Sequence, residues 1–208
     1  DWLDKNGEAD NTIVIFMSDN GGLSSEPEWR DGKLHTQNSP LNSGKGSAYE
    51  GGVREPMIVR WPGVVKPDTK CDKYLIIEDF YPTILEMAQI KHYKTVQPID
   101  GISFMPLLTH TGDPSKGRSL HWNFPNHWGN DGPGIGPTCT VRKGDWKLIY
   151  YYDSGKKELF NIPEDIGEKN DLAALHPDIV KSLSKELGDY LRLSLIHISE
   201  PTRLRRIS

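Results

Sequence analysis

An acidic residue and an amide stand side by side after an apolar segment. Asp19 and Asn20 follow residues 12–18, which are mostly apolar and β-branched, and two glycines come next. A carboxylate and an amide carbonyl are hard oxygen ligands, which suit Ca²⁺ or Mg²⁺. Gly21 and Gly22 would let the backbone turn sharply beneath such a site. An ordinary Asn-Gly turn uses the same residue types, so the pair alone leaves both interpretations open.

A lysine flanked by glycines lies further along the chain. Residues 44–54 read Gly-Lys-Gly-Ser-Ala-Tyr-Glu-Gly-Gly-Val-Arg. The glycines allow close backbone approach, and Lys45 supplies a compact positive charge for a tetrahedral anion. The segment is not a P-loop, because the required spacing of Gly and Lys-Ser/Thr is absent. Taken alone, it fits a flexible surface loop with a solvated lysine at least as well.

Charge and composition exclude several classes of protein. The 208 residues carry 25 Lys and Arg against 29 Asp and Glu, a net charge of −4, which argues against binding nucleic acid by phosphate neutralisation. No run of 18 apolar residues occurs, so no membrane-spanning helix is predicted. Cys71 and Cys139 are too few for a disulfide-rich scaffold or a four-thiolate zinc site, and their spacing does not demand a disulfide.

The N-terminal elements have to position these residues. Residues 12–18 predict a strand buried on both faces, as in a parallel sheet covered by helices, and ligands bind at the carboxyl ends of such strands. Residues 56–61 predict a second strand, and residues 23–52 a long loop. Asp79 predicts the N-cap of a helix over about 80–90.

The C-terminal part follows a different pattern. Aromatic and β-branched runs at 138–142, 146–152 and 157–160 are separated by hairpin residues, which predicts an antiparallel sheet. Residues 177–191 carry apolar side chains at helical spacing, so they predict an amphipathic helix that covers one face of that sheet. The predicted fold class is α/β, with a mostly parallel sheet followed by an antiparallel sheet and its packed helix.

Several ordered motifs together resemble the second half of a formylglycine-dependent sulfatase of the arylsulfatase type, within the alkaline phosphatase superfamily. The resemblance runs from about residue 12 to residue 191, and its motifs are residues 18–22, 44–56, 60–63, 79–85, 100–103, 142–149 and 158–161. Motifs in this order are much more specific than any one of them. The resemblance implies a sulfatase-like α/β sheet that is incomplete here.

The resemblance also implies a reaction and a set of site residues. In this family a Cys or Ser becomes formylglycine, whose hydrated form attacks the sulfur of a sulfate ester, while a divalent cation, usually Ca²⁺, holds the nucleophile and the sulfate oxygens. By match of motif, Asp19 and Asn20 are expected as metal ligands, and Lys45 as the catalytic lysine that contacts the sulfate. Fixed cations in a site closed to water stabilise developing charge. Glu50 and Arg54 are expected to form a structural ion pair that shapes the loop.

Three histidines are candidate substrate-binding residues. Residues 121–128 read His-Trp-Asn-Phe-Pro-Asn-His-Trp, and in similar sulfatases this region resembles a rim of the substrate pocket. Aromatic faces and the imidazoles of His121 and His127 suit sugar rings, whereas the alternative is an aromatic cluster that packs subdomains together. His35, in the long loop, is either a third pocket residue or simply exposed.

Half of the expected site is not in this sequence. A sulfatase needs a Cys- or Ser-x-Pro/Ala-x-Arg signature, and within residues 1–192 neither Cys71, Cys139 nor any serine is followed by one. Residues 199–203 read Ser-Glu-Pro-Thr-Arg and fit the pattern, but they lie in the stretch that we expect to be an artefact. The formylglycine nucleophile and a further pair of metal aspartates are therefore expected in a missing N-terminal part. The chain is expected to be inactive alone. Its parent is expected to act on an aryl or carbohydrate sulfate, and the resemblance suggests a periplasmic, secreted or lysosomal setting.

The expected domain organisation has three parts. Residues 1–118 are expected to be the C-terminal part of the catalytic α/β domain, and residues 119–192 the antiparallel subdomain with its amphipathic helix. Residues 193–208 resemble, at their start, a translated sequencing adapter, and we expect them to be an artefact. The alternative is a basic tail that binds an anionic partner. Without these residues the net charge is −6, which the loss of three Arg and one Glu explains.

Two other functions remain open at this point. The first is a phosphodiesterase or phosphonate hydrolase of the same superfamily, with similar metal chemistry. The motif around Lys45 favours a sulfatase over this alternative. The second is a non-catalytic, glycan-binding or structural fragment, whose mark would be glycan binding that does not depend on Ca²⁺.

Overall fold

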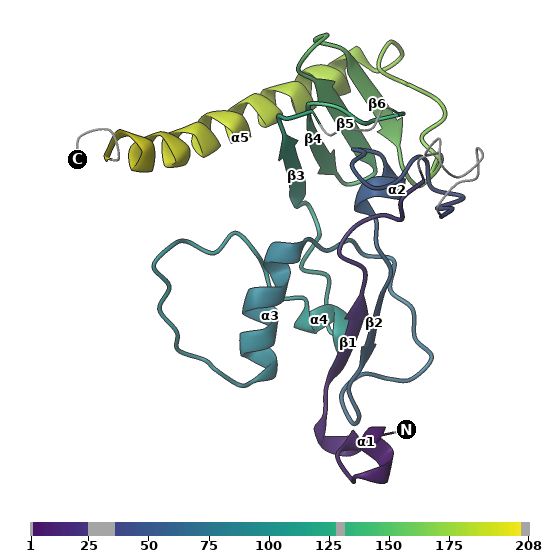
Figure 1. Cartoon of the computed structure of the whole chain (residues 1–208), viewed down its shortest axis with the longest axis vertical. Coiled ribbons are helices and arrows are strands. Elements are labelled where there is room, and N and C mark those ends of the chain that lie inside the picture. Colours follow the sequence, from purple (N-terminus) through teal and green to yellow (C-terminus); the bar gives the residue numbers. More distant parts are fainter. Residues whose placement is uncertain (1, 25–35, 128–131, 205–208) are drawn as a thin grey trace, which may run out of the picture. The chain divides into compact units, whose positions relative to one another are not determined.

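The structure is a computed structural model that describes residues 2–24, 36–127 and 132–204, with side chains described as far as Leu193 in the last helix (Figure 1). The chain divides into two compact units. The first unit takes the residues up to Ser18 together with Pro56–Arg118. The second takes Asp19–Glu55 and the chain from Ser119 onward, so the candidate site residues belong to the same unit as the C-terminal sheet.

The first unit combines a two-stranded ribbon with short helices. Its elements are α1 (Trp2–Lys5), η1 (Ala9–Asn11), β1 (Val14–Met17), β2 (Met57–Arg60), η3 (Ile77–Asp79), α3 (Phe80–Met87) and α4 (Met105–Leu108). The predicted helix after Asp79 is confirmed as α3, although it ends at Met87 rather than near residue 90.

The two strands of the first unit pair antiparallel, with Val14 opposite Arg60. The prediction of a parallel strand buried on both faces is wrong for β1. Phe16 is 68% exposed, and its partner Ile58 is 66% exposed. Apolar content indicates that a strand favours burial, but the direction of pairing and the cover over each face depend on which segments reach the strand.

Asp79 is the N-cap residue of α3, as predicted, and its side chain stabilises the turn before that helix. Its fully buried carboxylate accepts hydrogen bonds from the backbone N–H groups of Ile76 and Ile102, at 3.0 and 2.9 Å. It also pairs with the Arg118 guanidinium at 2.7 Å. The predicted N-cap position is therefore confirmed, but the side chain makes no capping hydrogen bond to α3. Instead, the carboxylate binds the two backbone N–H groups and the Arg118 guanidinium.

The second unit contains the antiparallel sheet and the long helix. Its elements are α2 (Glu50–Val53), β3 (Ser119–Phe124), β4 (Thr138–Lys143), β5 (Trp146–Tyr151), β6 (Lys157–Asn161) and α5 (Pro177–Leu204). The four strands lie in the order β3-β4-β5-β6, each antiparallel to its neighbour. The predicted antiparallel sheet and amphipathic helix are confirmed, and β3 is an edge strand that the sequence did not predict.

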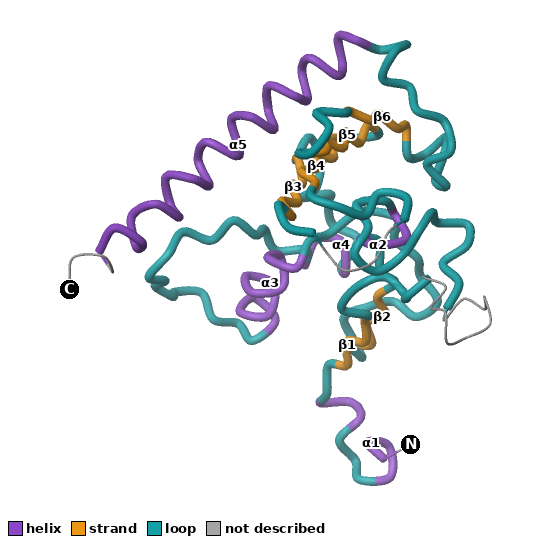
Figure 2. Tube along the Cα trace, turned by 45° about the horizontal axis from the view of Figure 1, so that its top comes forward, coloured by secondary structure: helices purple, strands orange, loops and turns teal. Residues whose placement is uncertain are grey.

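The sheet of the second unit is covered on both faces. Figure 2 shows the course of α5 and the four strands. On one face of the sheet, Leu183 and Leu187 of α5 pack against Val141 and Leu148. Successive side chains of a strand point to opposite faces, so Ile149 packs on the other face. There it meets buried side chains of a preceding loop and of β6, which are Ala48, Tyr49 and Phe160.

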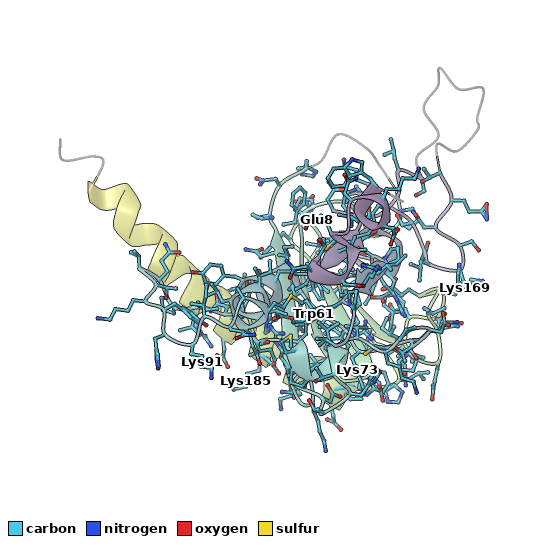
Figure 3. The ribbon with its side chains drawn as sticks, turned by 90° about the horizontal axis from the view of Figure 1, so that it is seen from below. Glu8, Trp61, Lys73, Lys91, Lys169 and Lys185 are labelled. Carbon is cyan, nitrogen blue, oxygen red and sulfur yellow. The ribbon has the colours of Figure 1, made fainter. Side chains whose placement is uncertain are left out.

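The outer face of α5 is polar. Lys185, visible on this helix in Figure 3, pairs with Asp189 one turn later at 2.8 Å. None of the helices among the described residues has the length and apolar character that crossing a membrane requires.

Candidate active site

The two segments with candidate chemistry are hydrogen-bonded to each other. We call residues 19–22 the Asp19 turn and residues 43–55 the Lys45 loop. The Gly21 N–H donates to the Gly52 carbonyl at 3.2 Å, and the Lys45 N–H donates to the Gly22 carbonyl at 3.1 Å. The backbone of the Asp19 turn therefore lies directly against the backbone that carries Lys45.

Glycines make this close approach possible. A Cβ atom on Gly21 would lie 1.8 Å from the Gly51 carbonyl oxygen, and one on Gly44 would lie 2.3 Å from the Gly22 carbonyl oxygen. No side chain fits at such distances, so both positions require glycine. The sequence indicated close backbone approach here but not which segments would meet.

Asn38 ties the Asp19 turn to the Lys45 loop from a third segment. Its Nδ2 donates to the Gly22 carbonyl at 2.8 Å and to the Ser43 carbonyl at 2.9 Å. Sequence reasoning missed this residue, because an asparagine within a polar loop carries no signal that separates it from its neighbours.

Two carboxylates and an amide gather at the Asp19 turn. Asp19 is exposed, and the half-buried Asn20 donates from Nδ2 to the Gly21 carbonyl at 3.1 Å. Burial raises the pKa of the Glu55 carboxyl, and the negative charge of Asp19 raises it further. The buried Oε1 atom of Glu55 has no hydrogen-bond partner among the described residues. Sequence reasoning did not single out Glu55 as a neighbour of Asp19.

These residues fit part of a site for a divalent cation. Asp19, Asn20 and Glu55 offer oxygen atoms, the ligand type that Ca²⁺ and Mg²⁺ prefer, and a cation would relieve the repulsion that raises the pKa of Glu55. Within the described ranges, no three His, Cys, Asp or Glu side chains are grouped to hold a metal by themselves. Any cation here would need further ligands from outside this set.

Lys45 faces a cavity of about 400 Å³. The side chain is exposed, and no acidic side chain in the described part of the chain pairs with it. Its charge is therefore available to an anion that enters the cavity. The backbone of Lys45 is held by Gly22, whereas its ammonium group lies at the end of a flexible stem.

A buried ion network lies beneath the Lys45 loop. Glu50, 1% exposed, pairs with Lys147 of β5 at 3.0 Å and with Arg142 of β4 at 3.3 Å. Lys147 also contacts Glu168 at 2.9 Å, and Glu168 accepts the Glu50 backbone N–H. The expected pair with Arg54 is present at 3.7 Å, but it is the longest of these contacts. The main partners of Glu50 are on the sheet, which the sequence did not indicate.

A second cluster of polar side chains fixes the same loop. The Tyr49 and Tyr151 hydroxyls both donate to one oxygen of Glu158, at 2.8 and 2.7 Å. Burial and the Glu158 carboxylate raise the pKa of both tyrosines, so both hydroxyls remain protonated donors at neutral pH. The ring of Tyr49 packs edge-on against Phe160 at 5.6 Å. The Lys45 loop is thus bound to the sheet by charges, hydrogen bonds and apolar contacts together.

The three candidate histidines have different surroundings. His121 stacks on Tyr190 of α5, with ring centroids 4.3 Å apart, and burial lowers its pKa. His121 thus packs against the helix of its own unit and not between subdomains, and its role in binding substrate stays a prediction. His127 is exposed and lies 3.3 Å from Asp153, so its role at a pocket rim stays a prediction. His35 lies outside the described residues.

The sequence of this chain matches a known protein family over most of its length. The profile of the family described as "N-sulphoglucosamine sulphohydrolase, C-terminal" matches residues 44–192. The chain belongs to this family of sulfatases. The matched region begins in the Lys45 loop and includes the whole antiparallel sheet of the sulfatase chain.

Two curated relatives carry the sulfatase name over most of this chain. A sulfatase of Formosa agariphila is 36% identical over 205 residues, which cover 94% of this chain and 35% of the relative. The uncharacterized sulfatase YdeN of Escherichia coli is 31% identical over 229 residues, covering 95% and 38%. The chain therefore spans somewhat more than a third of the length of these relatives.

Solved structures confirm the α/β fold class of alkaline-phosphatase-like sulfatases. Ps i-CgsB in complex with k-i-k-neocarrahexaose has a TM-score of 0.72 and 29% identity, covering 90% of this chain and 38% of that one. A protein in complex with its substrate D-glucosamine-2-N,6-O-disulfate has a TM-score of 0.69 at 24% identity, covering 92% and 36%. The phosphonate monoester hydrolase of Silicibacter pomeroyi, at 0.64 and 22%, covers 91% and 36%. The last two likenesses concern the fold alone.

Proposed function

We propose that this chain is the C-terminal part of a sulfatase that hydrolyses sulfate esters of glycans. The observation that carries the proposal is the backbone connection between the Asp19 turn and the Lys45 loop, which brings oxygen ligands and a cationic side chain into one substructure. The k-i-k-neocarrahexaose bound to Ps i-CgsB, which is 29% identical to this chain, supports a glycan as the partner.

Each site residue has a defined role in this proposal. Asp19 and Asn20 would hold Ca²⁺, or Mg²⁺, through their oxygen atoms, with Glu55 adding negative charge nearby. When bound, the cation would polarise the sulfate oxygens. Lys45 would meet the sulfate from the cavity side and offset the charge that develops on the bridging oxygen.

The buried network gives this arrangement its rigidity. Electrostatic stabilisation is strongest when the charged groups are fixed before the reaction begins. Glu50 anchors the Lys45 loop to β4 and β5, and Asn38 anchors the loop to the Asp19 turn. These residues act as positioning residues, because they hold the backbone of Lys45 and Asp19 rather than the substrate.

In this proposal, the formylglycine nucleophile is supplied by a part of the parent protein that this sequence does not contain. Residues 1–192 lack the signature for formylglycine, and its match at residues 199–203 lies in the expected artefact, so the 208 residues alone are expected to be inactive. The proposed parent protein works in a periplasmic, secreted or lysosomal setting.

The test compares variants of the product of the complete gene on 4-nitrophenyl sulfate and on a sulfated sugar. Lys45→Ala is expected to lower kcat/KM on both by about 10²–10³-fold, the range for losing one charge-stabilising group. Lys66→Ala, an exposed lysine of the other unit, is the matched control and should leave kcat/KM unchanged. Chelation by EDTA should abolish activity, and added Ca²⁺ should restore it.

Three outcomes would contradict the proposal. Unchanged hydrolysis by Lys45→Ala would remove the role of that lysine. Faster hydrolysis of phenylphosphonate esters than of sulfate esters would favour the phosphonate hydrolase. Glycan binding that needs no Ca²⁺, with no hydrolysis of any ester, would favour a non-catalytic fragment.

A further inference from the structure

The cavity beside Lys45 has two chemically different walls. One wall comes from residues 37–45 and carries mainly amide and hydroxyl side chains, among them Gln37 and Asn42, together with the apolar Leu41. The other wall comes from residues 132–135, just before β4, and presents the apolar side chains of Pro133 and Ile135. The roles given above to the metal ligands and to Lys45 leave both walls without a function.

The apolar wall is fixed to the Lys45 loop. The Ala48 N–H donates to the Gly134 carbonyl at 2.9 Å, and the Ser47 hydroxyl donates to the Pro133 carbonyl at 2.8 Å. A Cβ atom on Gly134 would lie 2.5 Å from the Ser47 hydroxyl oxygen, so the two segments are in direct contact. Both walls are therefore preformed around the cavity, as in most small-molecule sites.

The polar wall has unused hydrogen-bonding groups. The Asn38 side-chain amide already donates hydrogen bonds to two backbone carbonyls. In contrast, the side-chain amides of Gln37 and Asn42 form no hydrogen bond with any described residue, and each offers both donors and an acceptor. A ligand that enters this cavity would have to pair with them, because polar groups that a ligand covers without replacing their hydrogen bonds to water lower its affinity.

The combination of walls selects one class of ligand. A sugar ring has hydroxyl groups that match amides and C–H faces that pack on an apolar side chain such as Ile135. A flat aryl ring would cover Gln37 and Asn42 without bonding to them. A volume of about 400 Å³ lies near the lower end of the range for ligand pockets, which suits one ring rather than a long segment of polymer.

We propose that this cavity is the subsite for the sugar ring that bears the sulfate group, with Gln37 and Asn42 binding its hydroxyls and Ile135 packing against its face. The inference rests on the proposed function, since Lys45 at the cavity wall is then the residue that meets the sulfate. It makes these three side chains the specificity-determining residues for a sugar over an aryl ester.

The first test measures binding to the 208-residue chain by isothermal titration calorimetry. The probes are galactose 6-sulfate, phenyl sulfate and inorganic sulfate. Galactose 6-sulfate is expected to bind at least about fivefold more tightly than either of the others. Gln37→Ala and Asn42→Ala are each expected to weaken its binding about five- to tenfold, the usual size of one lost hydrogen bond, and to leave inorganic sulfate within about twofold.

A second variant tests the apolar wall. Ile135→Trp should fill the cavity and weaken binding of galactose 6-sulfate by at least about tenfold, with inorganic sulfate again within about twofold. Leu175→Trp is the control, since Leu175 is 72% exposed and does not line the cavity. Equal losses for all three probes, no loss with any variant, or binding of phenyl sulfate as tight as galactose 6-sulfate would overturn the inference.

Hydrolysis separates failure of the inference from failure of the proposed function. If the product of the complete gene hydrolyses sulfate esters but Ile135→Trp leaves its preference for sugar over aryl sulfate unchanged, the subsite is wrong and the sulfatase assignment stands. If it hydrolyses no sulfate ester, the proposed function itself fails.

Discussion

The two sheets of the molecule reverse the usual distribution of apolar and charged side chains. In β5 of the four-stranded sheet, Lys147 is fully buried, whereas in β1 of the two-stranded ribbon, Phe16 is 68% exposed. Lysine is among the residues least often buried, and phenylalanine among those most often buried. Residue type alone therefore does not decide burial here; the segments that cover each strand do.

The cover over the four-stranded sheet comes from within its own unit. Leu183 and Leu187 of α5 lie on one face, and the Lys45 loop lies on the other. This loop brings Glu50 to Lys147, so the buried ammonium has a carboxylate partner. Among the described residues of the first unit, Phe16 and Ile58 have no comparable cover. The sheet that carries the candidate site is thus the self-contained one.

The largest expected effect comes from breaking the buried network. Lys147→Met leaves Glu50 and Glu168 buried without their shared cation, and we expect the free energy of unfolding to fall by about 3–5 kcal/mol. The control is Lys143→Met in the same hairpin, whose half-exposed side chain pairs with Glu186 and should contribute no more than about 1 kcal/mol. Urea unfolding followed by tryptophan fluorescence measures both.

Removing the charges together sharpens this test. The triple variant Lys147→Met, Glu50→Gln, Glu168→Gln removes the three fully buried charges and takes only the Glu50 carboxylate from Arg142, so it should recover part of the stability that Lys147→Met loses. Similar losses for the Lys147 and Lys143 variants would mean that the network contributes nothing particular to the sheet.

The next effect compares one substitution on the two sheets. Ile149→Thr places a hydroxyl in a fully buried position and removes apolar volume, which should cost about 2–4 kcal/mol. Ile58→Thr makes the same change where the side chain is 66% exposed, and should change stability by less than about 0.5 kcal/mol. Thermal or urea unfolding of the two variants checks this, and a cost at Ile58 equal to that at Ile149 would show that β2 is covered after all.

The elements that could be predicted from the sequence are those with local signals. Hairpin residues at 144–145 and 153–155, with aromatic and β-branched runs between them, predict β4, β5 and β6 because turn chemistry depends on a few neighbouring residues. The apolar stripe of residues 177–191 predicts α5 for the same reason. The motif match further predicted which segments carry the candidate chemistry. The Asp19 turn and the Lys45 loop share backbone hydrogen bonds, and the roles of Asp19, Asn20 and Lys45 stay predictions.

What could not be predicted depends on partners far away in the chain. From the sequence alone, Lys147 would be predicted to face solvent, because its partners Glu50 and Glu168 are distant in the chain. Asp79 stands at the N-cap position of a helix in the sequence, yet its carboxylate pairs with Arg118 and accepts a hydrogen bond from the backbone N–H of Ile102, beyond α3. No periodicity encodes such contacts, because they arise only after the elements pack.

The smallest expected effect concerns His121, at the edge of the covered sheet. Burial against Tyr190 lowers its pKa, with Glu186 opposing and Lys143 adding to the shift. Below pH about 6.5 the unfolded chain takes up a proton that the folded chain resists, so this histidine contributes stability above that pH and loses it as the pH falls through its lowered pKa. Because the ring is only half buried, the loss between pH 7 and pH 5 should stay below about 1 kcal/mol.

His121→Phe isolates this contribution, because phenylalanine keeps a ring against Tyr190 but cannot take up a proton. The difference in unfolding free energy between His121→Phe and the unmodified chain should move in favour of the variant as the pH falls from 7 to 5. A pH-independent difference for His121→Phe would mean that the edge of the four-stranded sheet is open to water, which would weaken the contrast between the two sheets.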